Sequence, residues 1–258
     1  MSTPSFSPQK PLRVFVLFSG NATAIQYLRR MDPGYNHSYI VVGALTTNEK
    51  APGSAFFIRH TNNTDSETRR TKNQKKESIP CEIFDWRTFR SENPENKRKE
   101  YFQKILEILV DHDFDIIVCS GFHLRIPDFF IKSISPKKIV NAHPTDLSVM
   151  HIATRKRWFI GVWKQAIQLV LDAGMEDSRS TAHYITAGCD IDDGEIIAQS
   201  QRYRLIPGEG VEQVQDRLTR IGSDGEALAI ALQIICNGEN CEEGTFDRLK
   251  KLLQKVLS

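Results

Sequence analysis

Hydrophobic residues along this chain form two kinds of pattern, short continuous runs and longer segments with helical spacing. A continuous apolar run of strand length is typical of a parallel strand buried on both faces, whereas spacings of three and four residues are typical of an amphipathic helix. Runs of the first kind cover residues 12–18, 39–45, 79–84 and 114–119, and patterns of the second kind follow Ala24 and cover 97–110, 128–134 and 161–173. Their alternation predicts an α/β fold, a Rossmann-like, doubly wound, mostly parallel sheet with helices on both faces.

The rest of the chain predicts further elements and three appendages. We expect strands at 181–186 and 195–199, then a helix from Val211 and a long apolar continuation at 227–236. A chain of 258 residues can bury one large core, so residues 1–258 are expected to form a single domain. The appendages are a loose N-terminus at 1–11, a solvated insertion at 61–78 without any apolar residue, and a helical tail at 238–258.

One more strand carries candidate chemistry at the point where it ends. The run that starts at Lys137 stops at Pro144, which cannot donate a hydrogen bond to a neighbouring strand. Asn141 and His143 are two residues apart and therefore project from the same side of this strand. An amide and an imidazole at the carboxyl end of a strand can stabilise an oxyanion and relay a proton. The alternative is a turn-capping asparagine beside a surface histidine.

A second candidate site follows the first strand. A turn of small residues leads into a helical pattern there, and a helix N-terminus offers free N–H groups and positive dipole charge to an anion. The turn consists of Ser19, Gly20, Asn21, Ala22, Thr23 and Ala24. Neither the dinucleotide fingerprint nor the Walker loop is present, and a plain strand-to-helix turn is the alternative.

Composition and charge exclude several classes of function. Hydrophobic residues make up 40% and charged residues 26% of the chain, which is ordinary for a soluble globular protein. The net charge of +2 gives no reason to expect nucleic acid, and the basic insertion lacks the interleaved aromatic residues of a single-strand binder. No apolar run is long enough for a membrane helix, and the N-terminus lacks a signal-peptide core. Five scattered cysteines fit a reduced cytoplasmic setting.

Three blocks of this sequence resemble the folate-dependent formyltransferases. They are the first strand with SGNATAIQ, the segment from CSGFHLRIP to IVNAHPTDL, and HYITAGCDIDDGEIIAQ, in the order of that family. The resemblance implies the formyltransferase fold and a catalytic trio of Asn141, His143 and Asp192. Because the loop around Asp192 is two residues longer than usual, Asp190 and Asp193 are alternatives to it.

The same resemblance implies the ligands. 10-Formyltetrahydrofolate would be the formyl donor, with no metal ion, and its pterin would lie between the loops 121–126 and 186–193. The residues expected to contact this donor are Phe122, Leu124, Arg125, Ile126, Thr186, Asp190 and Asp193. A phosphate of the acceptor would rest on the turn after the first strand.

Several residues depart from the family where the acceptor would bind. Ala22 and Ala24 stand in place of a glycine and an asparagine, and the acidic residue that holds a ribose is replaced near Gly222. About nine additional residues follow the histidine segment and include Arg155 and Arg157. We expect these two arginines to supply part of the anion site as a lid, because guanidinium groups replace donors that the turn has lost. A solvated basic loop is the alternative.

The leading hypothesis is transfer of a formyl group from 10-formyltetrahydrofolate to a small-molecule primary amine. Glycinamide ribonucleotide, a phosphorylated acceptor of purine biosynthesis, is the first candidate and a nucleotide-linked amino sugar the second. A 10-formyltetrahydrofolate hydrolase and a non-catalytic folate- or nucleotide-binding module are the alternatives. The protein is expected to be a monomer or a homodimer.

Overall fold

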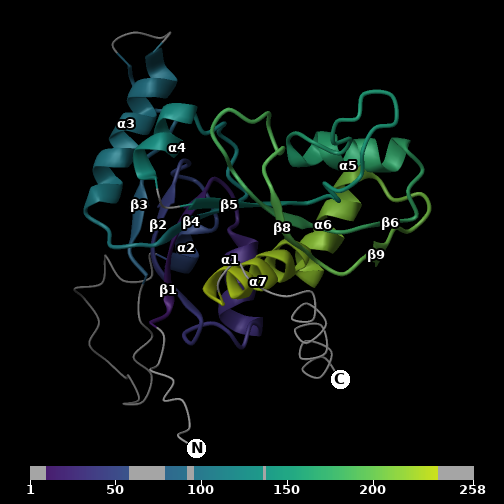
Figure 1. Ribbon diagram of the computed structural model, residues 1–258, viewed down its shortest axis with the longest axis horizontal. Coiled ribbons are helices and arrows are strands. Elements are labelled where there is room, and N and C mark those ends of the chain that lie inside the picture. The colour runs from purple at the N-terminus through teal and green to yellow at the C-terminus, as the bar shows by residue number, and fades with distance from the viewer. Residues whose placement is uncertain (1–9, 58–78, 92–95, 136–137, 238–258) are drawn as a thin grey trace, which may run out of the picture.

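The computed structural model describes residues 10–57, 79–91, 96–135 and 138–237, whose helices and strands are shown in Figure 1. The expected insertion at 61–78, the tail at 238–258 and most of the expected loose N-terminus lie outside these ranges. Within them, one sheet consists of seven strands: β1 (Leu12–Phe18), β2 (Tyr39–Thr46), β3 (Cys81–Ile83), β4 (Ile116–Ser120), β5 (Lys138–His143), β7 (Thr181–Tyr184) and β8 (Ile196–Gln199). A separate pair consists of β6 (Asp177–Ser178) and β9 (Tyr203–Arg204).

The strands of the large sheet lie in the order β3-β2-β1-β4-β5-β7-β8. Strands β1 to β5 pair in parallel, whereas β7 pairs antiparallel with β5, and β8 antiparallel with β7. The direction in which strands are added reverses between β1 and β4. Sheets of this kind bind ligands beyond the carboxyl ends of the strands at such a switch point. The predicted doubly wound, mostly parallel sheet is therefore confirmed.

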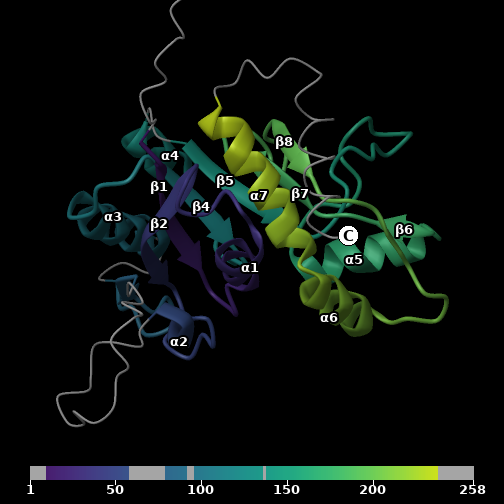
Figure 2. The same ribbon diagram turned by 90° about the horizontal axis from the view of Figure 1, so that it is seen from below.

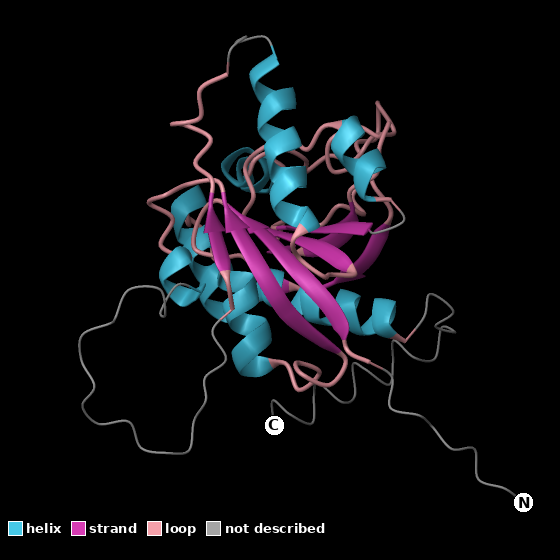
Figure 3. Ribbon diagram, turned by 90° about the vertical axis from the view of Figure 1, so that its left-hand side faces the viewer, coloured by secondary structure: helices cyan, strands magenta, loops and turns pink. Residues whose placement is uncertain are grey.

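Side chains of β1 alternate between two cores, as the pleat of a buried strand requires. Val14, Val16 and Phe18 face α1 (Thr23–Met31), α2 (Ser54–Phe57) and α7 (Ser223–Cys236). Phe15 and Leu17 face α3 (Lys97–Val110) and α4 (Asp128–Ile134) on the other side. Figure 3 shows helices on both sides of the sheet.

Two helices pack beside the sheet. Figure 2 shows α5 (Trp163–Asp172) and α6 (Val211–Ile221) at one side of the sheet. The two helices enclose a third core that includes Phe159. Gly222 separates α6 from α7 with a φ of 77°, and a Cβ there would meet Cδ2 of Tyr27 at 2.2 Å. Glycine is therefore required at this break. The break lets α7 pack against α1 and β8 while α6 packs against α5.

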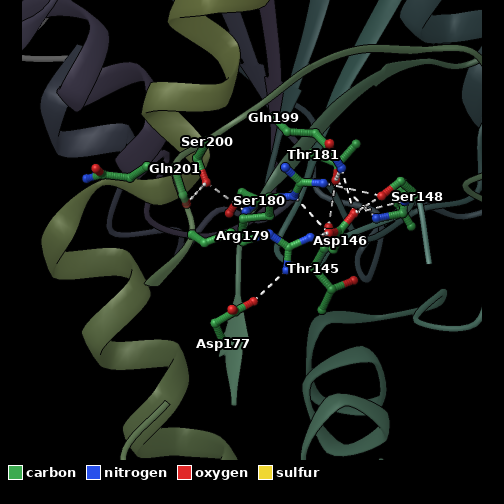
Figure 4. A network of polar contacts seen from close by, with 12 residues as sticks. Thr145, Asp146, Ser148, Asp177, Arg179, Ser180, Thr181, Gln199, Ser200 and Gln201 are labelled. Atoms are coloured by element: carbon green, nitrogen blue, oxygen red, sulfur yellow. Dashed lines mark hydrogen bonds and ion pairs between the residues drawn. The ribbon is translucent and has the colours of Figure 1, made fainter. Parts of the chain in front are cut away.

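The loop that follows β5 is anchored by the buried carboxylate of Asp146, which Figure 4 shows at the centre of a polar network. Its Oδ2 accepts hydrogen bonds from Arg179 Nε at 2.8 Å and Arg202 Nη2 at 2.9 Å, and its Oδ1 accepts one from Gln199 Nε2 at 2.6 Å. Burial raises the pKa of this carboxyl, but hydrogen bonds from Ser148 and Arg179 outweigh it and lower the pKa overall. The network ties the loop after β5 to the strands β6, β8 and β9.

Most of the expected strands and helices are present within one or two residues of their predicted ends. The small β6–β9 pair and α2 have no counterpart among the predictions, because two- and four-residue elements give no periodic signal. No helix in the described part of the chain is long and apolar enough to cross a membrane.

Candidate active site

A cavity of about 720 Å³ lies at the carboxyl ends of the central strands. Asn141 and His143 line it from β5, as their predicted placement on one side of the strand requires. Asp192 lines it from the loop between β7 and β8. The structure thus brings the three residues of the expected trio to one site.

Two fixed partners orient the imidazole of His143, which is 3% exposed. Its Nε2 lies 2.8 Å from the carbonyl oxygen of Phe159. Because a carbonyl oxygen only accepts, Nε2 carries the proton and donates it. The other ring nitrogen, Nδ1, lies 3.6 Å from Asp192 Oδ2. Thr145 Oγ1 donates to the same carbonyl at 2.7 Å, so this acceptor is itself held in place.

Among the three aspartates of the loop, the structure favours Asp192 as the partner of His143. Its side chain is 10% exposed, whereas those of Asp190 and Asp193 are 73% and 55% exposed. The backbone N–H of Gly161 donates to Asp192 Oδ2 at 3.0 Å. Asp192 has a φ of 59°, in the left-handed region that aspartate tolerates better than most residues. This conformation turns its carboxylate inward.

His183 is a fourth member of the cluster that sequence reasoning missed. It lies directly opposite Asn141 in the antiparallel pairing of β5 and β7. Its Nδ1 lies 3.0 Å from the carbonyl oxygen of Tyr184, so Nδ1 is the donor and Nε2 can accept from Asn141 Nδ2 at 3.2 Å. Nε2 also lies 3.6 Å from Asp192 Oδ1. A histidine within the apolar alternation of 181–186 is the signal that could have found it.

Burial controls the charge of His183. Burial is the main cause that lowers its pKa to about 4; Asp192 opposes this shift, and the nearby His143 adds to it. His183 is therefore neutral near pH 7 and presents a lone pair on Nε2. This lone pair fixes the orientation of the Asn141 amide, which leaves its second N–H for a ligand.

The expected donor-binding residues lie mostly in the cavity wall. Phe122, Leu124, Arg125, Ile126, Thr186 and Asp190 line the cavity. Asp193 does not, because its carboxylate faces Arg157, with Oδ1 at 3.7 Å from Nε.

The turn after β1 contributes only its central residues to the cavity. Gly20, Asn21, Ala22 and Thr23 line it, whereas Ser19 and Ala24 do not. Ser19 is buried, where its Oγ bonds to Thr47 Oγ1 at 2.7 Å and accepts from the His123 N–H at 3.1 Å. Ala24 packs in the core beneath α1. Of the six residues expected to contact the ligand, Ser19 and Ala24 therefore lie behind the four that line the cavity.

The two expected lid arginines lie outside the cavity lining. Arg155 is exposed at the tip of a hairpin, and Arg157 is 13% exposed in its side chain. Arg157 donates through Nη1 to the carbonyl oxygen of Asp192 and through Nη2 to that of Gly194 at 2.8 Å. Its guanidinium thus binds the loop between β7 and β8, residues 185–195, which we call the acidic loop. The guanidinium therefore does not face the cavity.

Two carboxylates from the C-terminal helices complete the cavity. Asp216 lies on α6 and Asp224 in the first turn of α7, and both line it. Burial raises the pKa of the Asp224 carboxyl, although the hydrogen bond from Ser180 Oγ at 2.6 Å opposes this. The sequence predicts the loss of an acidic residue near Gly222, and neither of these carboxylates was expected from it. Among the described residues, no group of three or more His, Cys, Asp and Glu side chains could hold a metal ion.

The fold and the site together define a class of protein. An amide donor, an imidazole and a carboxylate converge in one cavity at the switch point of a Rossmann-like sheet, which suits transfer of a carbonyl-derived group. The formyl transferase family model matches residues 12–230. The chain belongs to the formyl transferase family, and the protein is a formyltransferase enzyme.

Solved structures agree with this fold. The structure of phosphoribosylglycinamide formyltransferase from Brucella melitensis is similar with a TM-score of 0.63 and 23% identity, over 89% of this chain and 97% of that one. The enzyme of that name from Anaplasma phagocytophilum gives a TM-score of 0.63 and 20% identity, over 88% and 87%. Glycinamide ribonucleotide transformylase 1 from Symbiobacterium toebii gives 0.65 and 18%, over 94% and 95%. No curated protein sequence matches significantly.

Proposed function

We propose that this formyltransferase moves a formyl group from 10-formyltetrahydrofolate to a primary amine. The observation that carries the proposal is the convergence of Asn141, His143 and Asp192 in one cavity, with 3.6 Å between the imidazole and the carboxylate. A non-catalytic binding module would not need this arrangement, because each of the three side chains is oriented by a further partner.

The reaction forms a tetrahedral carbon that bears an oxyanion. The amine nitrogen attacks the formyl carbon, the C–O double bond becomes a C–O⁻ single bond, and the bond to N10 of the folate then breaks. The second N–H of Asn141 can donate to this oxygen, and so can Nδ1 of His143 when it carries a proton. A single donor of this kind is typically worth about 3–4 kcal/mol in the transition state.

Proton movement completes the balance of the reaction. The attacking amine loses a proton, and N10 of the folate gains one as it leaves. Asp192 Oδ2 and His143 Nδ1 lie within 3.6 Å of each other, so this pair can accept the first proton and return it, directly or through a water. Products are the formamide and tetrahydrofolate.

The donor fits the side of the cavity formed by the loop after β4 and by Thr186 and Asp190. Leu124 and Ile126 supply apolar walls, and Phe122 packs on Phe102 with ring centroids 6.4 Å apart. Backbone groups of both loops can pair with the polar edge of a pterin ring.

For the acceptor, glycinamide ribonucleotide, an intermediate of purine biosynthesis, is the first candidate. The similar structures carry the names phosphoribosylglycinamide formyltransferase and glycinamide ribonucleotide transformylase. The turn Gly20–Thr23 at the start of α1 supplies backbone N–H groups for a phosphate. Ala22 adds a Cβ at this turn, which keeps a nucleotide-linked amino sugar as the second candidate.

The test is an acceptor screen that follows tetrahydrofolate release from 10-formyltetrahydrofolate. Glycinamide ribonucleotide, a nucleotide-linked amino sugar and no amine form its three arms. Release that depends on glycinamide ribonucleotide supports the proposal. Equal release in all three arms indicates a hydrolase, and no release in any arm, despite donor binding, contradicts transfer.

A further inference from the structure

The hairpin at residues 149–158 contacts the loop that carries Asp192. Met150 pairs with Arg157 in an antiparallel bridge, and the N–H of Trp158 donates to the carbonyl oxygen of Val149 at 3.0 Å. The hairpin follows β5, whereas the loop that carries Asp192 joins β7 to β8. Two segments that are far apart in sequence therefore meet beside the site.

Arg157 makes the central contact between these segments. Its Nη1 and Nη2 donate to the carbonyl oxygens of Asp192 and Gly194, which lie on either side of Asp193. The planar guanidinium holds several donors in a rigid fork, so it can bridge two carbonyls where an ammonium group reaches one. The side chain is 13% exposed, so water competes little for these carbonyls.

The charges of the two segments are complementary. Asp190, Asp192 and Asp193 place three carboxylates within four residues, and they repel one another. Lys156 Nζ lies 3.2 Å from Asp190 Oδ2, but both side chains are more than 70% exposed, so this pair contributes little. Arg157, whose side chain is more buried, is the cation that can hold the loop.

The loop needs such a contact to keep Asp192 in place. Asp192 has a φ of 59°, a left-handed conformation that a residue with a Cβ adopts only when its surroundings hold it there. After Asp192 the chain is fixed, because a Cβ on Gly194 would meet the carbonyl oxygen of Tyr184 at 1.7 Å. Before it, Asp190 and Ile191 are exposed. The bond from Arg157 acts where the fixed and the exposed parts of the loop meet.

The segment 157–161 contacts both Asp192 and His143, and it does so through every second residue. Arg157 holds the backbone of Asp192, and the carbonyl oxygen of Phe159 accepts from His143 Nε2 at 2.8 Å. The N–H of Gly161 donates to Asp192 Oδ2 at 3.0 Å. One short stretch of chain thereby sets the distance between the imidazole and the carboxylate.

We propose that Arg157 is a positioning residue for formyl transfer, which clamps the backbone of Asp192 so that its carboxylate meets His143. The inference rests on the proposed function, in which Asp192 and His143 act together. It gives the basic hairpin a role in catalysis through the enzyme's own loop and not through the acceptor.

The test compares Arg157→Ala and Arg157→Lys with Lys156→Ala in the same hairpin, with 10-formyltetrahydrofolate and glycinamide ribonucleotide. Arg157→Ala is expected to lower kcat about 10- to 100-fold while the donor KM changes less than about threefold, because a misplaced group is lost from the transition state. Arg157→Lys keeps the charge but cannot bridge both carbonyls, so it recovers only part of kcat. Lys156→Ala, the matched control, stays within about twofold of the original enzyme.

Hydrogen exchange of the loop amides at 186–194 gives a second readout that needs no turnover. Exchange there should increase in Arg157→Ala and remain unchanged in Lys156→Ala. If Arg157→Ala does not fold, Arg157→Lys carries both measurements. Unchanged kcat and unchanged exchange would overturn the clamp. Asp192→Asn is measured in parallel: full turnover in that variant refutes the proposed catalytic trio, and exchange then decides the clamp on its own.

Discussion

The corner that holds the proposed catalytic residues and the turn after β1 lie in the same cavity but are built differently. In the corner, Asn141, His143, Asp192 and His183 are buried or nearly so, and each has partners with defined distances. In the turn, Gly20–Thr23 line the cavity, and Ala22, which directly precedes α1, makes no side-chain capping hydrogen bond. We propose that the corner acts through its side chains and the turn through its backbone N–H groups.

This difference separates reaction type from substrate choice. An oxyanion and a moving proton need an amide, an imidazole and a carboxylate at fixed distances, so a change in any of them changes the chemistry. A phosphate on a helix N-terminus needs N–H groups that almost any residue supplies, so side chains in the turn can vary. We therefore expect substitutions in the corner to change kcat and substitutions in the turn to change the acceptor KM.

The largest effect is expected in the corner itself. His143→Ala and Asp192→Asn should each lower kcat about 100- to 1,000-fold, because the lost interactions belong to the transition state. Donor affinity, measured by titration with a non-transferable folate, should change far less. Asp190→Asn in the exposed part of the loop should lower kcat much less than Asp192→Asn. The reverse order would show that Asp190 is the acting carboxylate and would remove Asp192 from the trio.

The anchor behind the corner should have the largest effect on stability. Asp146→Asn leaves Arg179 and Arg202 without their buried carboxylate, and breaking such a pair should cost about 3 kcal/mol of the free energy of unfolding. Urea denaturation measures this loss. Arg13→Ala, which removes the exposed pair with Asp113, is a comparison expected to cost less than about 1 kcal/mol. Equal losses would mean that the network in Figure 4 does not anchor the loop.

The pH dependence of stability tests the buried histidine. The ordinary pKa of histidine is about 6.5, and in the folded protein burial lowers that of His183 to about 4. His183 therefore binds a proton more readily in the unfolded chain than in the folded protein. The stability that depends on a neutral His183 is fully present above pH 6.5 and is lost as the pH falls from there through 4. His183→Gln should make the free energy of unfolding fall less steeply over this range. An unchanged slope would contradict a neutral, buried His183.

The smallest effect is expected in the turn. Ala22 has a φ of 49°, where glycine is preferred, but its methyl group is 3% exposed and packs in the core, so Ala22→Gly should change the free energy of unfolding by about 1 kcal/mol or less. It also removes a Cβ from a turn that lines the cavity, so the KM for a phosphorylated acceptor should fall while the donor KM stays constant. Thermal unfolding and steady-state kinetics measure the two effects. A changed donor KM with a constant acceptor KM would place the donor at this turn.

The sequence by itself determined the elements and part of the site. Apolar periodicity is a local property, so Leu12–Phe18 and the helix Lys97–Val110 could be predicted with their observed ends. The alternation of side chains along a strand also placed Asn141 and His143 on one side of β5. The family resemblance added Asp192, with Asp190 and Asp193 left as alternatives in the same loop.

Only the tertiary structure decided which distant segments meet. His183 became a partner of Asn141 through strand register, and Arg157 became a partner of the Asp192 loop through the hairpin, although 35 residues separate Arg157 from Asp192. Ser19 and Ala24 turned inward while their neighbours faced the cavity. Sequence patterns record whether a residue prefers burial, but the identity of its neighbours depends on how the whole sheet and its loops pack. For that reason the chemistry could be predicted from motifs, and its geometry could not.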